Sequence, residues 1–173
     1  MIGGPIASGK STLAIAVARA FESRGLAAAT IDLDLVYEML EHARAPKNDA
    51  ALWARARRTA GALTKALLAE GINVVIAEGD FLDDPSRQEF VSKLAEDVRV
   101  RFVTLRVDLL TALSRVDQDP TRGTSRDRRF LTRHYEEVAE TLRVRPAQDL
   151  GLDTGVVTVK QATDAIVAFL GHL

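Results

Sequence analysis

The sequence has 173 residues, of which 47% are hydrophobic and 27% charged, so it is long enough for one domain with a buried core. Its net charge of -1 provides no overall positive field, and we expect neither nucleic acid nor an anionic membrane as a partner. The absence of cysteine excludes disulfides, thiolate catalysis and cysteine metal sites. No apolar run approaches the roughly twenty residues that span a bilayer, so a cytoplasmic protein is expected.

The first motif lies at residues 4–11, Gly-Pro-Ile-Ala-Ser-Gly-Lys-Ser, which match the pattern G-x-x-x-x-G-K-[ST] of a phosphate-binding loop. A predicted helix over 11–24 follows it and stops at Gly25. The glycines let the backbone wrap round a phosphate, Lys10 would bridge the outer phosphates of ATP and Ser11 would ligate Mg²⁺. The residues expected to bind ATP here are Gly4, Ala7, Ser8, Gly9, Lys10, Ser11 and Thr12.

Only Met1, Ile2 and Gly3 precede this loop, whereas a buried strand normally has about five residues. Either the first strand is very short or the natural start of the chain lies upstream. We favour the upstream start, because a central strand lost from a parallel sheet exposes apolar surface on its neighbours.

The rest of the chain alternates predicted strands with predicted helices. The strands are expected at 27–31, 73–77, 98–107 and, weakly, 151–154. The helices are expected at 35–43, 50–70, 84–95, 108–116, 130–142 and 161–170. This alternation predicts an α/β fold of three layers, with a parallel sheet of about five strands in a single domain over residues 1–173.

Acidic residues follow two of the predicted strands, where ligands bind in open α/β sheets. Asp32 and Asp34 end the second strand, and Glu78 and Asp80 end the third. If the strand continues that far, Asp32 and Asp34 lie on one side of it, so that one holds a metal or its water and the other accepts a proton. The alternative is that Asp34 only caps a helix that begins at Leu35.

A polar stretch over 118–129, within an arginine-rich segment that starts at Arg115, predicts a lid. Arginines on a closing lid compensate the charge of a transferring phosphate, which would be the role of Arg122 or Arg126. The alternative is a solvated loop whose aspartates neutralise these arginines. Arg58, on the long predicted helix, is a candidate to clamp an acceptor. His42, His134 and His172 lack the spacing of metal ligands.

In its order of motifs the chain resembles the small P-loop kinases of the shikimate kinase, gluconate kinase and chloramphenicol phosphotransferase type, which have the nucleoside-monophosphate-kinase-like fold. The resemblance implies that Asp34 is the base or substrate anchor and that Glu78 and Gly79 belong to the acceptor loop. It also implies that Arg115 flanks adenine together with the segment 154–156. Shikimate kinases usually carry a run of glycines where this chain has Glu78-Gly79-Asp80.

The function expected from these residues is an ATP-dependent transfer of phosphate to a hydroxyl of a small metabolite or antibiotic, with Mg²⁺. One alternative is a nucleoside or nucleotide kinase, in which Arg57 and Arg58 would bind an acceptor phosphate. Another is a switch that binds ATP without catalysis. A guanine-reading Asn-Lys-x-Asp element is absent. The sequence indicates neither the acceptor nor the oligomeric state.

Overall fold

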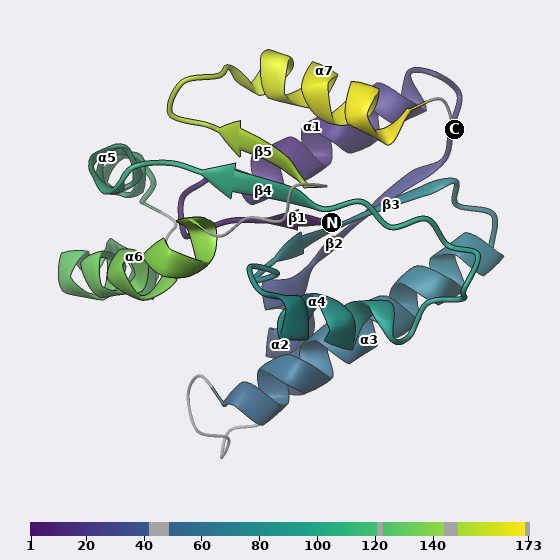
Figure 1. Ribbon diagram of the computed structural model, residues 1–173, viewed down its shortest axis with the longest axis horizontal. Helices are drawn as coiled ribbons and strands as arrows, with labels where there is room; N and C mark the ends of the chain where they lie inside the picture. The colour runs from purple at the N-terminus through teal and green to yellow at the C-terminus, as the bar shows by residue number, and fades with distance from the viewer. Residues whose placement is uncertain (42–48, 121–122, 144–148, 172–173) are drawn as a thin grey trace.

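The computed structural model describes residues 1–41, 49–120, 123–143 and 149–171. Its centre is a parallel sheet with the strand order β2-β3-β1-β4-β5, which confirms the predicted fold class (Figure 1). The strands are β1 (Ile2–Gly3), β2 (Ala28–Asp32), β3 (Val74–Gly79), β4 (Val103–Arg106) and β5 (Leu150–Asp153). The central position of β1 brings the loop that follows it to the carboxyl edge of the sheet.

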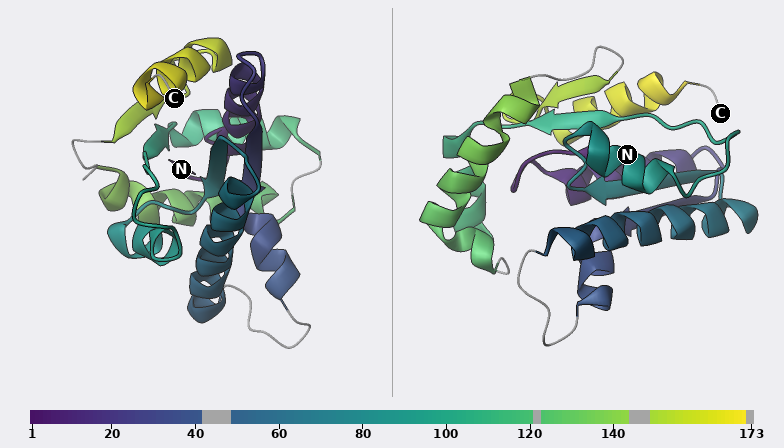
Figure 2. Two further views of the ribbon diagram at one scale, coloured as in Figure 1. Left: turned by 90° about the vertical axis from the view of Figure 1, so that its right-hand side faces the viewer. Right: turned by 60° about the horizontal axis from the view of Figure 1, so that its bottom comes forward.

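Helices cover both faces of the sheet and one of its ends. They are α1 (Lys10–Glu22), α2 (Leu33–Leu40), α3 (Ala50–Ala69), α4 (Asp84–Val91), α5 (Leu109–Gln118), α6 (Arg128–Arg143), α7 (Val159–Leu170) and the short 3-10 helix η1 (Thr124–Arg126). Figure 2 shows α1 and α7 on one face of the sheet and α3 on the other, with α5 and α6 at the end that carries the phosphate loop. Within the described ranges, no helix is both long enough and apolar enough to cross a membrane.

Three apolar clusters hold these layers together. The first joins α1 and α7 to the sheet through side chains such as Phe21 and Ile166, and the second joins α3 and α4 to it through Ala60 and Phe90. The third lies under α5 and α6 and includes Leu131. Because this third cluster also contains Ala7 of the phosphate loop, the packing of α5 and α6 is coupled to the site.

Several helix boundaries differ from the sequence expectation by one or two residues, and one by four. The second predicted helix begins at Leu33 rather than Leu35, because the side chain of Asp32 caps it. The fourth helix ends at Val91 rather than at residue 95. Beyond Val91, the N–H groups of Lys93 and Leu94 bond to carbonyls only three residues back, which tightens the chain into turns. Residues 42–43, the end of the first of these predicted helices, lie outside the described ranges.

The predicted strand over 98–107 is shorter in the structure, where β4 covers Val103–Arg106. The cause is the length of β1, which pairs with β3 and β4 through Ile2 and Gly3 alone. On the side of β1, residues 98–101 therefore have no strand beside them, and neither does the start of β3. The gap is an apolar cavity of about 370 Å³, and its walls include Val75, Val98 and Val100.

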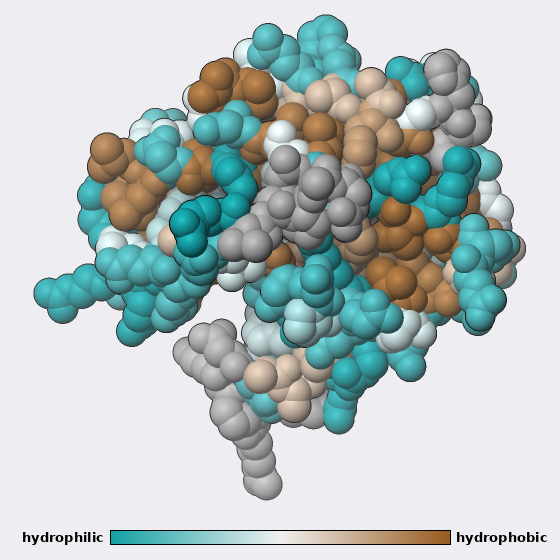
Figure 3. Space-filling model, in the orientation of Figure 1, coloured by the Kyte–Doolittle hydropathy of each residue, from teal (hydrophilic) through white to brown (hydrophobic). Residues whose placement is uncertain are grey.

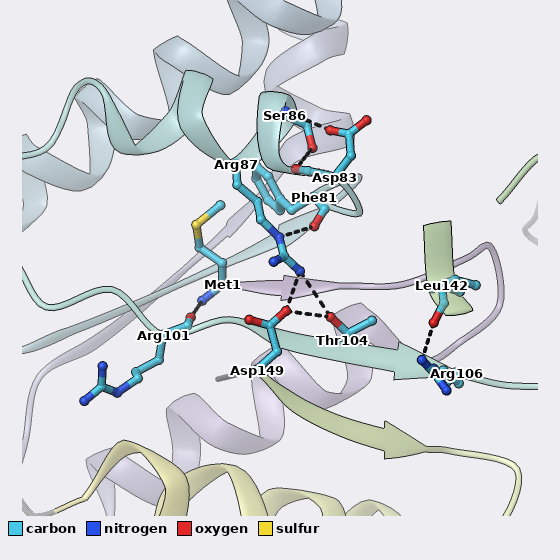
Figure 4. Close-up of polar contacts among 10 residues, drawn as sticks. All are labelled: Met1, Phe81, Asp83, Ser86, Arg87, Arg101, Thr104, Arg106, Leu142 and Asp149. Carbon is cyan, nitrogen blue, oxygen red and sulfur yellow. Dashed lines mark hydrogen bonds and ion pairs between the residues drawn. The ribbon is translucent and has the colours of Figure 1, made fainter. Parts of the chain in front are cut away.

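The amino group of Met1 stands at this cavity and donates a hydrogen bond of 2.7 Å to the carbonyl of Arg101 (Figure 4). Burial, and then the charge of Arg87, lower the pKa of this amino group from 8.0 to about 5. Arg87 itself forms a buried ion pair of 2.7 Å with Asp149 and a hydrogen bond to Thr104, which fixes α4 against β4. The sheet thus has an unfilled apolar gap with a poorly solvated amine at its side.

Candidate active site

The phosphate loop, residues 4–11, has the tight backbone that its sequence predicts. A Cβ on Gly4 would lie 2.6 Å from the hydroxyl oxygen of Ser8 and 2.9 Å from the Cβ of Leu105, so only glycine fits there. Gly9 has a φ of 89° and Ala7 a φ of 63°, the left-handed conformation that turns successive N–H groups toward one centre. No side chain caps the N-terminus of α1, which leaves its first turn available to an anion.

Side chains donate hydrogen bonds to the carbonyls of this loop. Lys10 folds back to donate hydrogen bonds to the carbonyls of Gly4, at 3.0 Å, and Pro5, at 3.2 Å. The next three carbonyls each accept a hydrogen bond from a side chain far along the sequence: Tyr135 to Ile6 at 2.8 Å, Arg115 to Ala7 at 3.0 Å and Thr154 to Ser8 at 2.9 Å. These bonds orient the peptide planes, so that the N–H groups between them face the site.

A cavity of about 360 Å³ opens beside the loop, between α1 and α7. Its walls include Ala7, Thr12, Arg115, Thr154, Val157 and Val159. Arg115 also donates a hydrogen bond of 3.0 Å to the hydroxyl of Thr154, which ties α5 to the segment after β5. The cavity has apolar walls, polar backbone at its rim and the phosphate loop at its mouth, a combination that suits a planar heterocyclic base. Of the residues expected to flank adenine, Arg115 and Thr154 line this cavity, and their contact with adenine stays a prediction.

On the other side of the loop, acidic residues meet at the ends of β2 and β3. Asp32 pairs with Glu78 in the sheet register, and the carboxylate of Asp32 accepts the N–H of Asp34 at 2.8 Å. Asp32 and Asp34 were expected on one side of a strand that continues through both. The strand does not continue that far, because β2 ends at Asp32 and Asp34 lies in the first turn of α2. It is also Asp32, and not Asp34, that caps this helix.

These carboxylates share one electrostatic environment with Lys10. Burial raises the pKa of Asp34, the Lys10 ammonium opposes that rise, and Asp32 and Asp80 add to it. Burial likewise raises the pKa of Glu78, which is only 4% exposed, while a hydrogen bond with Ser11 and the charge of Lys10 lower it. A carboxylate whose pKa is raised is a better proton acceptor at neutral pH than an ordinary aspartate.

The donors at this edge fit a magnesium ion. The Ser11 hydroxyl lies beside the Glu78 carboxylate, and Asp32 is its register partner across β2 and β3. Hydroxyl and carboxylate oxygens are the ligands that Mg²⁺ takes in phosphoryl-transfer sites, where phosphate and water supply the rest. Among the described residues, no group of three or more histidines and acids is close enough to hold a metal by itself.

Two of the residues expected to meet the acceptor have other surroundings. Gly79, with a φ of 152°, lies against Leu33, and a Cβ on it would approach the Cβ of Leu33 to 2.5 Å. It therefore allows α2 to pack on the end of β3. Arg58 is exposed on α3, whereas Arg57 turns inward and forms an ion pair of 2.6 Å with Glu89.

The expectation that Arg122 or Arg126 meets the transferring phosphate stays a prediction, and in the structure α6 rather than the segment 118–129 contacts Ile6 of the phosphate loop. Arg126 is exposed on η1 and bonds to the carbonyl of Pro120, and Arg122 lies outside the described residues. The contacts come instead from His134 and Tyr135 of α6, which both bond to Ile6. The sequence analysis missed this pair. The sequence feature that could have indicated it is a pair of polar residues three and four positions after the buried Leu131, on the same face of the helix. Figure 3 shows the molecule indented between the hydrophilic surface over α6 and the side that carries α2 and α3.

The sheet order, the phosphate loop and the flanking helices define a P-loop kinase-like protein. Residues 1–148 match the family described as AAA domain (AAA_33), and the chain belongs to that family. No curated protein matches the chain.

Solved structures show how widely this fold is shared. An unliganded sugar kinase from Janibacter sp. HTCC2649 has a TM-score of 0.69 at 16% identity, over 98% of this chain and 91% of that one. The APS kinase CysC of Mycobacterium tuberculosis, in complex with AMPPNP and APS, has a TM-score of 0.66 at 16% identity, over 99% and 95%. The tunicamycin resistance protein of Deinococcus radiodurans has a TM-score of 0.63 at 16% identity, over 99% and 94%. At such identities the likeness concerns the fold.

Proposed function

We propose that the protein is a kinase that transfers the γ-phosphate of ATP to a hydroxyl group of a small molecule. The observation that carries this proposal is the meeting of Lys10 with two carboxylates of raised pKa, those of Asp34 and Glu78. Such a transfer requires two groups on opposite sides of the reacting hydroxyl. One is a lysine that binds phosphate, and the other is a carboxylate that accepts a proton. A protein that uses ATP in this way also fits the expected cytoplasmic location.

ATP would lie with its base in the cavity lined by Arg115 and Val159 and its phosphates on the loop. Lys10 would leave the carbonyls of Gly4 and Pro5 and donate its hydrogen bonds to phosphate oxygens instead. A charged phosphate oxygen forms a stronger hydrogen bond with an ammonium group than a neutral carbonyl does. Ser11 and Asp32, with Glu78 beside them, would hold Mg²⁺, which neutralises phosphate charge when it is bound. The carbonyls of Ile6, Ala7 and Ser8 stay bound to Tyr135, Arg115 and Thr154 throughout, so the N–H groups remain oriented.

On the acceptor side, Asp34 would orient the attacking hydroxyl and take its proton as the new O–P bond forms and the bond to the leaving ADP oxygen breaks. It lies in the first turn of α2, where the charge of Lys10 acts on its carboxylate. The raised pKa supports this role, since a stronger base accepts the proton more readily.

What favours a hydroxyl acceptor over an acceptor phosphate is the ion pair of Arg57 on α3, together with the carboxylates of the site. Arg57 is held in an ion pair with Glu89, and the site itself presents carboxylates to the acceptor. Fixed negative charge beside the acceptor would repel a nucleoside monophosphate. The names of the structural neighbours agree with this choice, since they include a sugar kinase and a shikimate kinase.

The proposal is tested by measuring ADP release from Mg-ATP across a panel of sugars, shikimate-like acids, nucleosides, aminoglycosides and phenicols. Release that an acceptor stimulates, and that Lys10→Ala abolishes, would support the kinase and identify its acceptor class. Stimulation by nucleoside monophosphates alone would favour the nucleotide kinase. Tight ATP binding with no stimulated release by any acceptor would contradict the proposal in favour of the switch.

A further inference from the structure

Helix α6 binds the phosphate loop at a single residue, Ile6, through two consecutive side chains. Nε2 of His134 accepts the N–H of Ile6 at 3.2 Å, and the hydroxyl of Tyr135 donates to the carbonyl of Ile6 at 2.8 Å. An imidazole nitrogen that accepts a hydrogen bond carries no proton, so the ring is neutral with its proton on Nδ1. Nε2 of His134 thus accepts a hydrogen bond from a backbone N–H of the loop, as an oxygen of a bound anion would.

The charges around His134 place it at the end of the loop where Lys10 lies. Three charged groups act on its pKa: Lys10 from the loop, Asp80 from the end of β3 and Glu137 from α6 itself. Burial, the largest effect, and Lys10 lower this pKa, while Asp80 and Glu137 raise it. A phosphate bound by Lys10 would add negative charge beside the ring, which favours the imidazolium form.

We propose that His134 is the residue by which α6 binds the terminal phosphate of ATP, and that it exchanges the Ile6 N–H for a phosphate oxygen as it takes up one proton. This inference rests on the proposed function, because it requires ATP in the loop. The proton comes from solvent to Nε2, which then donates it in a hydrogen bond to the phosphate oxygen. The N–H of Ile6, released from the ring, becomes a further donor to the same phosphate.

This assignment gives His134 the part that the sequence suggested for a lid arginine. In the described part of the lid segment 118–129, Arg126 bonds to Pro120 rather than to the loop. A histidine differs from an arginine in one measurable respect: it is neutral when the site is empty and charged when phosphate is present. Binding of ATP therefore consumes a proton, whereas binding to an arginine would not.

The test is calorimetric titration of the full chain with Mg-ATP and with Mg-ADP near pH 7.5, in buffers of different ionisation enthalpy, which reports the protons taken up. We expect the wild type to take up a fraction of a proton, up to one, with ATP and less with ADP. His134→Asn should abolish the difference and reduce the preference for ATP over ADP about tenfold, the worth of one charge-assisted hydrogen bond.

His134→Gln is the second variant, because its side-chain carbonyl can accept the Ile6 N–H but takes no proton. It should keep the melting temperature near that of the wild type and still lose the proton uptake. The matched controls are His42→Asn and His172→Asn, which should each retain the uptake.

Three results would overturn the inference. ATP binding that Lys10→Ala abolishes but that takes up no proton through His134 would refute it while leaving the proposed function intact. Uptake that persists in both His134 variants, with equal losses of affinity for ATP and ADP, would make His134 a structural contact only. A wild type that does not bind ATP at all would refute the proposed function and the inference together.

Discussion

The carboxylate of Asp32 accepts the backbone N–H of Asp34 at 2.8 Å, so the last residue of β2 fixes the orientation of the first turn of α2. The proposed metal ligand and the proposed base are thereby linked, because Asp32 caps the helix on whose first turn Asp34 lies. Substitutions at Asp32 must therefore be chosen to separate its charge from its hydrogen bond.

Asp32→Asn keeps a good helix cap but removes the charge, and Asp32→Ala removes both. We expect the asparagine variant to keep its melting temperature and to need several-fold more Mg²⁺ for half-maximal turnover. The alanine variant should lose about 1 kcal/mol in addition, or about 2–4 °C in melting temperature. Equal Mg²⁺ requirements in the wild type and Asp32→Asn would contradict the metal role.

Asp34→Asn should reduce kcat by about a hundredfold or more, which is the usual effect of losing a general base, while ATP affinity changes little. The matched control is Glu38→Gln, which removes a carboxylate from the next turn of the same helix and should leave kcat within a few-fold of the wild type. Steady-state kinetics with the identified acceptor measures both. A kcat unchanged in Asp34→Asn would rule this residue out as the base.

Glu78→Gln should make the protein more stable at neutral pH and less active. Because folding raises the pKa of Glu78 above its ordinary 4.5, the folded state binds more protons than the unfolded state between those two pKa values. Stability is then lost as the pH rises through this range, and the neutral glutamine avoids that loss. Thermal melts of both proteins from pH 4 to pH 8 should show an advantage of the variant that grows with pH. A constant difference would show that the Glu78 carboxyl is not destabilised by burial.

The amino group of Met1 should make stability depend on pH in the opposite direction. With its pKa lowered from 8.0 to about 5, the folded state has lost a proton that the unfolded state still binds between these pH values. Stability of the 173-residue chain should therefore rise from pH 5 to pH 8. The measurement is the same series of melts, repeated after selective acetylation of the terminal amine, which should flatten this part of the profile.

An apolar extension of four residues before Met1 should raise the melting temperature, because it can pair with the unpaired side of β3 and fill the cavity of about 370 Å³. A Gly-Ser extension of the same length is the control, since it removes the terminal charge from the cavity without filling it. If the two extended proteins melt alike, the gap in the sheet does not accept a strand.

Most of the fold could be predicted because its signals are local. The phosphate loop has a fixed pattern, and strands such as 73–77 are apolar runs between glycines and acids. The error at 98–107 has a different origin: its residues favour a strand, but residues 98–101 have no residue of β1 to pair with. A strand depends on its partner, which a local pattern does not report.

The site was predictable where one motif carries it and not where distant residues meet. Gly4, Gly9 and Ser11 follow from the loop pattern, and Arg115 was placed from the resemblance. His134 and Tyr135 were not singled out, because their contact with Ile6 joins positions more than 120 residues apart. The role expected of Arg126 at the transferring phosphate stays a prediction; in the structure its side chain bonds to the carbonyl of Pro120.

The three side chains that bind the loop carbonyls come from residues 115, 135 and 154, which follow their partners by 108, 129 and 146 positions. On the ribosome the loop emerges first, but its shape is complete only after β5 and the segment beyond it have been made. Contacts of such long range form late in folding. A nascent chain that stops before Thr154 therefore carries the whole phosphate-loop sequence without an oriented loop, and capture of nucleotide is among the last properties that this chain acquires.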